Sequence, residues 1–280
     1  MKPAWHEAFT PEALRYLSDL PVLHEITPEW AWGGSTGRGV KVAVIDSGIN
    51  NEHPAVGGAV RGYVRVVEEQ GQYSYDEAPH TDLFGHGTAC AGLIHKVAPE
   101  AELYSVQVLS PTGGGSGGRF AAGLHWAIEH EMQVCNLSLG TTKRDFYAAL
   151  HELADTAYFK NVILVTAANN MPQPSFPSMY ASVISVACND EQDPFRFYFN
   201  PAPPVNFGAP GIDVQVAWQD GGYATMTGNS FAAPHMTGIV ALILAKHPGL
   251  TPFLVKTILH STAWNVRYPG PEAAPAESRD

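Results

Sequence analysis

Three polar residues of this 280-residue chain have the side chains that nucleophilic catalysis requires. Asp46 ends the apolar segment VAVID, His86 lies in GHGTACAG, and Ser230 lies in GNSFAAPHM. A serine hydroxyl attacks efficiently only when a neighbouring base removes its proton and a third group holds that base. An aspartate, a histidine and a serine brought to one point would therefore form a catalytic triad.

Each of the three residues also has an ordinary structural explanation. An aspartate at a strand end is often a turn or capping residue, a histidine between glycines is often a loop residue, and a serine before a helix is often an N-cap. The combination argues against these explanations. Asp46, His86 and Ser230 follow one another in that order, and each is expected at a strand end or a helix start.

The intervening sequence predicts the elements that would hold these residues at one edge of a sheet. Nearly continuous apolar runs are typical of strands buried on both faces, and they occur at 40–45, 101–109, 134–139, 162–168 and 183–188. Helix-like segments lie among them, at 86–97, 119–131 and 144–159. This alternation predicts a three-layer α/β fold with a mostly parallel central sheet and helices on both faces. Ligands of such sheets bind beyond the carboxyl ends of the strands, where Asp46 is expected.

We expect one domain with an extension at each end. Residues 1–25 form the N-terminal extension, which contains a candidate amphipathic helix. Residues 26–263 form the domain itself. Residues 264–280 are rich in proline, alanine and glutamate, and we expect this tail to be disordered.

Composition and charge limit the classes of partner. The net charge of 16 − 27 = −11 argues against nucleic acid, which needs a basic face. The longest apolar run, residues 239–245, is too short for a bilayer, and the N-terminus does not read as a secretory signal. Cys90, Cys135 and Cys188 have no CxxC spacing and fit free thiols in a reducing compartment, although one disulfide plus one thiol also satisfies the count. We therefore expect a cytoplasmic protein with neither a nucleic-acid nor a membrane partner.

The segments around the three polar residues resemble motifs of the subtilase family of serine peptidases. VAVIDSGINNEHP, HGTACAG and GNSFAAP are similar to the family's Asp, His and Ser boxes, and the resemblance covers roughly residues 26–263. It implies a subtilisin-like peptidase domain and a serine endopeptidase with Asp46, His86 and Ser230 as its triad. NVILVTAANN is similar to the strand that supplies an oxyanion-hole asparagine, here Asn170. The alternative for Asn170 is a turn residue.

The resemblance also implies where a polypeptide substrate would bind. In subtilases an extended peptide adds as a strand between two backbone segments. Ser138-Leu139-Gly140 is similar to one of these segments and Gly113-Gly114-Gly115 to the other, although a glycine run is also compatible with a flexible loop. Family members often carry a bulky side chain where this chain has Gly117, so we expect a more open cleft there.

Several positions depart from the family pattern. Asn229 stands where the family usually has threonine or serine before the nucleophile, and Asn169 replaces a glycine beside the primary specificity pocket. Ala55 stands in place of an aspartate that binds calcium in secreted members, and LIHKVAPEAELY is too short for their ligand loop. We therefore expect no metal or other cofactor. Cys90 matches a free cysteine of the family's thiol-containing branch.

Two other functions are compatible with these motifs. One is a dedicated maturation protease that trims a single precursor peptide, for example in a peptide natural-product pathway. The missing calcium loop and the altered Asn169 would suit such an enzyme. The other is a non-catalytic homologue that binds peptides in the cleft without cleaving them. The intact triad positions and Asn170 favour an enzyme.

Overall fold

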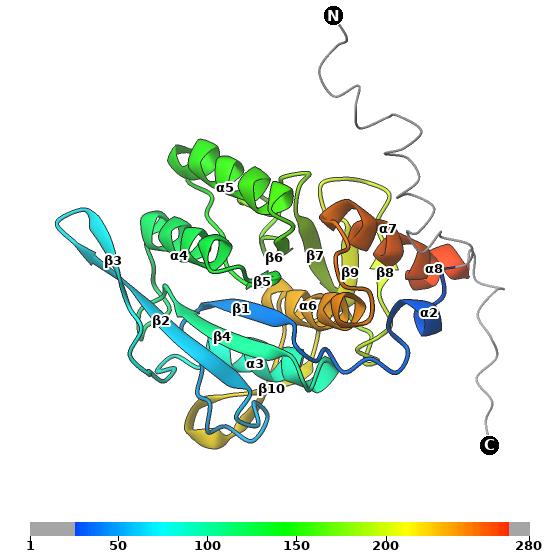
Figure 1. Cartoon of the computed structure of the whole chain (residues 1–280), viewed down its shortest axis with the longest axis horizontal. Helices are drawn as coiled ribbons and strands as arrows, with labels where there is room; N and C mark the ends of the chain where they lie inside the picture. Colours follow the sequence, from blue (N-terminus) through cyan, green and yellow to red (C-terminus); the bar gives the residue numbers. More distant parts are fainter. Residues whose placement is uncertain (1–25, 269–280) are drawn as a thin grey trace, which may run out of the picture.

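A nine-stranded, mostly parallel sheet divides the protein into three layers (Figure 1). The structure, a computed structural model, describes residues 26–268. The strands lie side by side in the order β3-β2-β4-β1-β5-β6-β7-β9-β8. Their bounds are β1 (Lys41–Asp46), β2 (Val60–Glu69), β3 (Gln72–Asp76), β4 (Glu102–Gln107), β5 (Val134–Leu137), β6 (Ile163–Ala167), β7 (Ile184–Asn189), β8 (Tyr198–Phe199) and β9 (Phe207–Pro210).

The five central strands β4, β1, β5, β6 and β7 occupy the five predicted apolar runs, and each neighbouring pair is parallel. These runs are apolar because helices cover both faces of the sheet. In β1, Val42 and Val44 pack into the core on one face, whereas Ala43 and Ile45 pack into the core on the other. The predicted three-layer α/β fold is confirmed.

The helices form the two outer layers. On one face, α3 (His86–Val97) packs against α6 (Asn229–Lys246). On the other face, α4 (Gly117–Glu129) and α5 (Tyr147–Phe159) cover the sheet, and the predicted helix at 144–159 divides into η3 (Arg144–Phe146) and α5. The remaining elements are α2 (Pro28–Trp32), β10 (Val214–Ala217), η4 (Gln219–Gly221), β11 (Tyr223–Met226), α7 (Pro252–Thr262) and α8 (Trp264–Arg267). Within residues 26–268, no helix is both long and apolar enough to cross a bilayer.

The β2–β3 hairpin projects from one edge of the sheet and was not predicted (Figure 1). In β2 the buried Val64 and Val66 are separated by the exposed Arg65, and β3 is mostly exposed. Such alternation is typical of a strand with one face in water. A search for continuous apolar runs therefore misses it.

The C-terminal boundary of the domain lies later in the structure than predicted. Residues 264–280 were assigned to the tail, but α8 occupies Trp264–Arg267, so the predicted boundary at 263 is too early. Trp264 donates its backbone N–H to the Phe197 carbonyl at 2.8 Å, and the Arg196 guanidinium lies 4.1 Å from its ring centroid. These contacts hold α8 on the domain. The helix predicted within residues 1–25 lies outside the described residues.

Candidate active site

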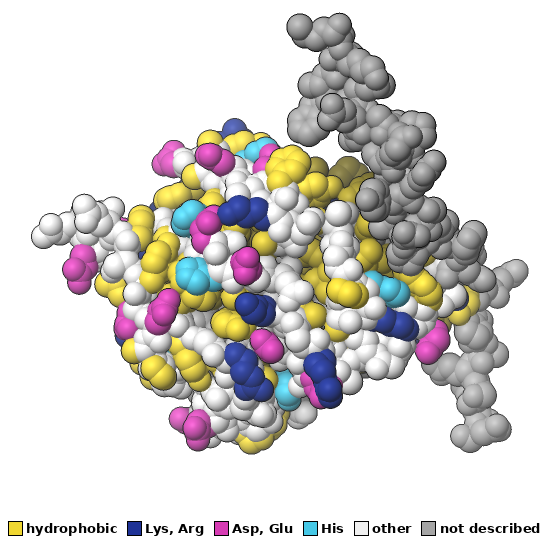
Figure 2. Space-filling view, viewed as in Figure 1, with side chains coloured by type: hydrophobic (Ala, Val, Ile, Leu, Met, Phe, Trp, Pro, Cys, Tyr) yellow, Lys and Arg dark blue, Asp and Glu magenta, His cyan; other side chains and the backbone are white. Residues whose placement is uncertain are grey.

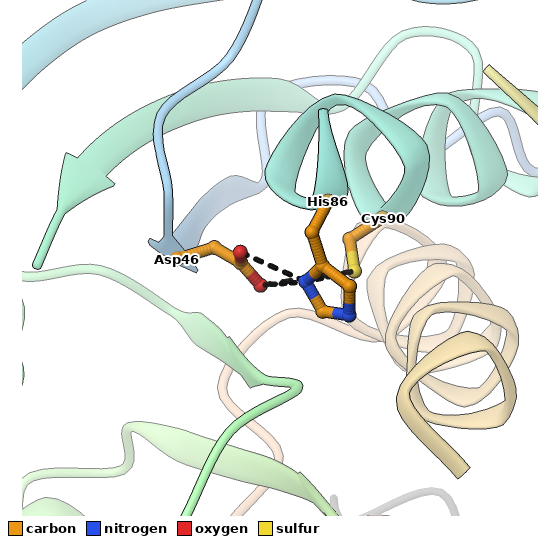
Figure 3. Close-up of side chains that lie close together, drawn as sticks. All are labelled: Asp46, His86 and Cys90. Carbon is orange, nitrogen blue, oxygen red and sulfur yellow. Dashed lines mark hydrogen bonds and ion pairs between the residues drawn. The ribbon is translucent and has the colours of Figure 1, made fainter. Parts of the chain in front are cut away.

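The predicted Asp–His pair forms at the carboxyl end of β1. Asp46 is the last residue of β1 and is fully buried, and His86 is the first residue of α3. The Nδ1 atom of His86 lies 2.9 Å from each oxygen of the Asp46 carboxylate, while its second ring nitrogen points away (Figure 3). The Ser47 backbone N–H donates to the same carboxylate at 2.8 Å. The carboxylate thus orients the ring and leaves Nε2 for another partner.

Burial and charge act in opposite directions on His86. Burial disfavours the charged imidazolium, but the adjacent Asp46 carboxylate favours it and raises the pKa of His86 well above its ordinary value. Burial also raises the pKa of the neighbouring Cys90 thiol, which keeps that group neutral at neutral pH. His86 is therefore a base whose protonated form is stabilised in place.

A carboxylate that the sequence analysis missed sets the start of α3. Asp82 accepts hydrogen bonds from the backbone N–H groups of Gly85 at 2.8 Å and Thr88 at 2.9 Å, groups that have no partner inside the helix. At Gly87, a Cβ atom would lie 2.1 Å from the Gly48 carbonyl oxygen, so only glycine lets α3 approach the end of β1 this closely. In the sequence, the only indication of this role is that Asp82 stands shortly before GHG.

Ser230 is brought to the same edge by contacts of its backbone. It is the second residue of α6 and is partly exposed. The Cys90 Sγ atom lies 3.6 Å from the Ser230 carbonyl oxygen, 3.9 Å from Asp46 Oδ2 and 4.0 Å from His86 Nδ1. One sulfur atom therefore touches all three predicted triad residues. Among residues 26–268, the Ser230 hydroxyl forms no hydrogen bond in this structure, with His86 or with any other group.

A buried polar chain connects Ser230 with the predicted substrate-binding segment. The Ser138 hydroxyl donates to the Ser230 carbonyl oxygen at 2.7 Å. Asn136 donates to Ser138 at 3.0 Å and accepts from the Thr237 hydroxyl of α6 at 3.0 Å. Buried polar groups are costly unless they are paired, so these hydrogen bonds fix the position of α6 relative to β5.

Asn170 presents an amide beside the start of α6. Its Oδ1 accepts the backbone N–H of Asn229 at 2.8 Å, which assigns the other end of the amide as Nδ2. The residue is exposed, and Nδ2 donates to no group in the part of the chain that the structure describes. An N–H donor is thus available next to Ser230, as the oxyanion-hole interpretation requires.

The two predicted substrate-binding segments line one cleft together with His86. Gly113, Gly115, Ser138, Leu139 and Gly140 all contribute to this cleft, whose accessible volume is about 360 Å³. Gly114 lies between two of these residues without lining it. At Gly113, φ is +78° and a Cβ atom would lie 2.6 Å from the Phe84 ring, so the glycine run has a defined steric role. Lys143 lies in the wall of the same cleft.

Asn169 and Gly117 are two further predicted positions at the cleft, and the structure differs from the prediction at Gly117. Asn169 lies in the wall of a second hollow with Met171 and Met179, and its side chain accepts the Met171 backbone N–H at 2.9 Å. Its amide therefore stabilises its own loop. Gly117 does line the cleft, but the expected opening is filled, because a Cβ atom there would lie 2.5 Å from the Phe146 ring. A ring from η3 occupies the space that a side chain at 117 would take.

Few of the described side chains are grouped as metal ligands. Within the described ranges, the group of three side chains close enough to share a metal ion is Asp46, His86 and Cys90, two of which form the predicted acid–base pair. The calcium site of secreted members does not fit this chain. Ala55 carries no ligand oxygen, and its methyl group lies against Gly92 of α3, where a Cβ atom would be 3.2 Å away.

Comparison with known proteins defines the class and then the family. Two solved structures share the fold: a cold-adapted subtilisin-like serine proteinase, with a TM-score of 0.66 and 29% identity, and the S41 psychrophilic protease, with a TM-score of 0.69 and 28% identity. The first alignment covers 84% of this chain and 87% of that one, and the second covers 81% and 84%. A model of the subtilase family matches residues 37–277. The chain belongs to the subtilase family.

Characterised relatives support the same assignment. Subtilisin E of Bacillus subtilis (strain 168) is 35% identical over 245 residues, which cover 82% of this chain and 62% of the relative. Subtilisin Savinase of Lederbergia lenta is 35% identical over 241 residues, covering 82% of this chain and 85% of the relative. The chain thus spans less than two thirds of the length of several curated relatives that it matches.

Proposed function

We propose that this protein is a serine endopeptidase that cleaves polypeptides through an acyl-enzyme. The observation that carries the proposal is the Asp46–His86 pair, with Nδ1 held at 2.9 Å and the Cys90 sulfur within 4.0 Å of groups of all three predicted triad residues. Membership of the subtilase family supports the same reaction.

In the proposed reaction, Ser230 Oγ attacks the carbonyl carbon of the scissile peptide bond. His86 Nε2 takes the hydroxyl proton, and the resulting imidazolium is stabilised by the Asp46 carboxylate at Nδ1. The imidazolium then gives that proton to the leaving amine as the C–N bond breaks, which leaves an ester on Ser230. Water then attacks the ester carbonyl carbon as His86 Nε2 takes its proton. The imidazolium returns that proton to Ser230 Oγ as the C–O bond of the ester breaks, which releases the acid and the free serine.

The negative oxygen of each tetrahedral intermediate would meet two N–H donors. Asn170 Nδ2 is one, because its Oδ1 is already engaged by Asn229. The Ser230 backbone N–H is the other, since the first N–H groups of a helix have no partner within it and Ser230 is the second residue of α6. The N-terminal end of the α6 dipole adds to the same field.

The test is hydrolysis of a quenched fluorogenic peptide by wild type and by Ser230→Ala. Wild type should turn over and the variant should lose activity by several orders of magnitude while keeping its melting temperature. Peptide binding without cleavage by the wild type would support the non-catalytic homologue instead. A comparison of casein hydrolysis with the cleavage sites found in a peptide library then separates the two kinds of protease. A broad endopeptidase should cleave both, whereas a protease that trims one precursor should cleave few sequences.

We further propose that the protein acts in a reducing compartment, the cytoplasm, on a polypeptide and not on a nucleic acid. Cys90, Cys135 and Cys188 are free thiols, and Cys90 lies beside the predicted base, where its oxidation would disturb the site. On the face shown in Figure 2, acidic and basic side chains are interspersed. Imaging of a tagged full-length chain in its own cells tests the compartment, and retention outside the cytoplasm would contradict it.

A further inference from the structure

Asn229, the residue before Ser230, is bonded to two strand ends of the site, the segment 168–170 after β6 and Cys188 of β7. The residue is 8% exposed. Its Nδ2 donates to the carbonyl oxygens of Ala168 at 3.1 Å and Asn169 at 3.0 Å, and its Oδ1 accepts the Cys188 backbone N–H at 2.8 Å. Its own backbone N–H donates to Asn170 Oδ1 at 2.8 Å.

Three of these bonds attach one residue of α6 to three consecutive residues beyond β6. The segment Ala168–Asn169–Asn170 follows the end of β6, and Cys188 belongs to β7, so Asn229 joins two strand ends to the helix that carries Ser230. Only a side-chain amide offers two N–H donors and an acceptor at one position. A threonine or serine hydroxyl has a single donor and cannot reproduce the two carbonyl contacts at once.

We propose that Asn229 is a positioning residue that fixes the Asn170 amide relative to Ser230. This inference rests on the proposed function. The side chain of Asn229 holds the backbone before Asn170, and its N–H holds the Asn170 side chain. An oxyanion donor acts only if it lies about 2.7–3.1 Å from the position of the developing charge, so its effect depends on this support.

The proposal predicts how two variants behave in the purified full-length chain. Asn229→Ala removes all three side-chain bonds and should lower kcat roughly 10- to 100-fold, because a donor displaced by about 1 Å loses on the order of 100-fold in rate. KM should change much less, because the lost interaction belongs to the transition state. Asn229→Asp keeps the shape and the acceptor for Cys188 but turns a carboxylate oxygen toward the two carbonyl oxygens. It should therefore lose kcat at least as strongly, and it provides a variant of nearly unchanged volume.

A double-mutant cycle separates positioning from a general structural role. If Asn229 acts through Asn170, the effects of the two substitutions are not additive. Adding Asn229→Ala to a chain that already carries Asn170→Ala should then lower kcat by less than about twofold. Asn206→Ala is the matched control. Asn206 is partly buried and its amide oxygen accepts the Ser185 backbone N–H at 3.1 Å, away from the cleft, so its loss should lower the melting temperature and leave kcat unchanged.

The outcomes distinguish this inference from the proposed function. The positioning role is supported if both Asn229 variants lose kcat and if Asn229→Ala causes no comparable further loss in a chain that carries Asn170→Ala. Full kcat in folded Asn229→Asp and Asn229→Ala overturns it, and so does a loss that is undiminished in that background. A wild-type chain that neither hydrolyses peptides nor reacts with a serine-directed fluorophosphonate would instead overturn the proposed endopeptidase itself.

Discussion

The two halves of the candidate site are built from different interactions. The half around β1 and α3 depends on a buried charge: the Asp46 carboxylate, which holds His86 at 2.9 Å. The half around β6 and α6 depends on neutral amides: Asn170 and Asn229, joined at 2.8 Å. A buried charge sets a protonation state, whereas an amide sets only a position. The first half should therefore respond to pH and the second should not.

The largest effect is expected when the charged half is neutralised. Asp46→Asn retains the shape but loses the negative charge that stabilises the imidazolium and selects its tautomer. A loss of about 10⁴-fold in kcat is typical of this change in a triad. The measurement is steady-state kinetics on one fluorogenic peptide. Asp155→Asn is the control, because Asp155 also contacts a histidine, His151 at 3.6 Å, but on the surface. Equal effects of the two variants would contradict the account.

A smaller loss is expected when the amide half is broken. Asn170→Ala removes one oxyanion donor and should lower kcat roughly 10²- to 10³-fold, a magnitude measured on subtilisin, which is a relative of this chain. KM should stay nearly constant, and the Ser230 backbone N–H should preserve some activity. Full kcat in a variant with an unchanged melting temperature would show that Asn170 is a turn residue.

The pH profile of kcat/KM distinguishes the charged half of the site from the amide half. Only neutral His86 can accept the serine proton, so kcat/KM should rise as pH increases through the pKa of His86 in the free enzyme. Because Asp46 raises that pKa, the midpoint should lie above 6.5, the ordinary value for histidine. Asn170→Ala should lower the whole profile without moving this midpoint. A midpoint below pH 6.5, or a midpoint that shifts in Asn170→Ala, would argue against the division of the site into a charged half and an amide half.

The smallest effect is expected at Lys143, which belongs to neither half. It lies in the wall of the cleft. Its charge would there act on a bound substrate and not on the reacting atoms. Lys143→Glu should reduce kcat/KM for peptides with an acidic side chain near the cut by roughly 2- to 5-fold, mainly through KM, as for an exposed ion pair. Lys160→Glu, at a lysine that pairs with Glu129 at 2.7 Å, is the control. Identical profiles for both variants would remove Lys143 from substrate selection.

The difference between the halves also explains what the sequence could predict. Asp46, His86 and Ser230 lie in short motifs at the ends of apolar runs, so their elements and their common edge could be inferred from local pattern. The support of the amide half could not, because Asn229 and Ala168 are 61 positions apart and meet only when α6 packs beside β6. The ring that fills the space at Gly117 belongs to Phe146, also distant in the chain. Long-range contacts of this kind leave no local periodicity.

The most direct test of the central claim is to find which residue a serine-directed reagent modifies. Phenylmethylsulfonyl fluoride reacts with an activated serine hydroxyl, and its sulfonyl group then remains attached to the enzyme. We predict one added group per chain, located on Ser230 by peptide mass spectrometry, with peptide hydrolysis lost in proportion to labelling. Asp46→Asn should slow the labelling because the base is impaired. Modification of a different residue, or full hydrolysis by a completely labelled chain, would contradict the account.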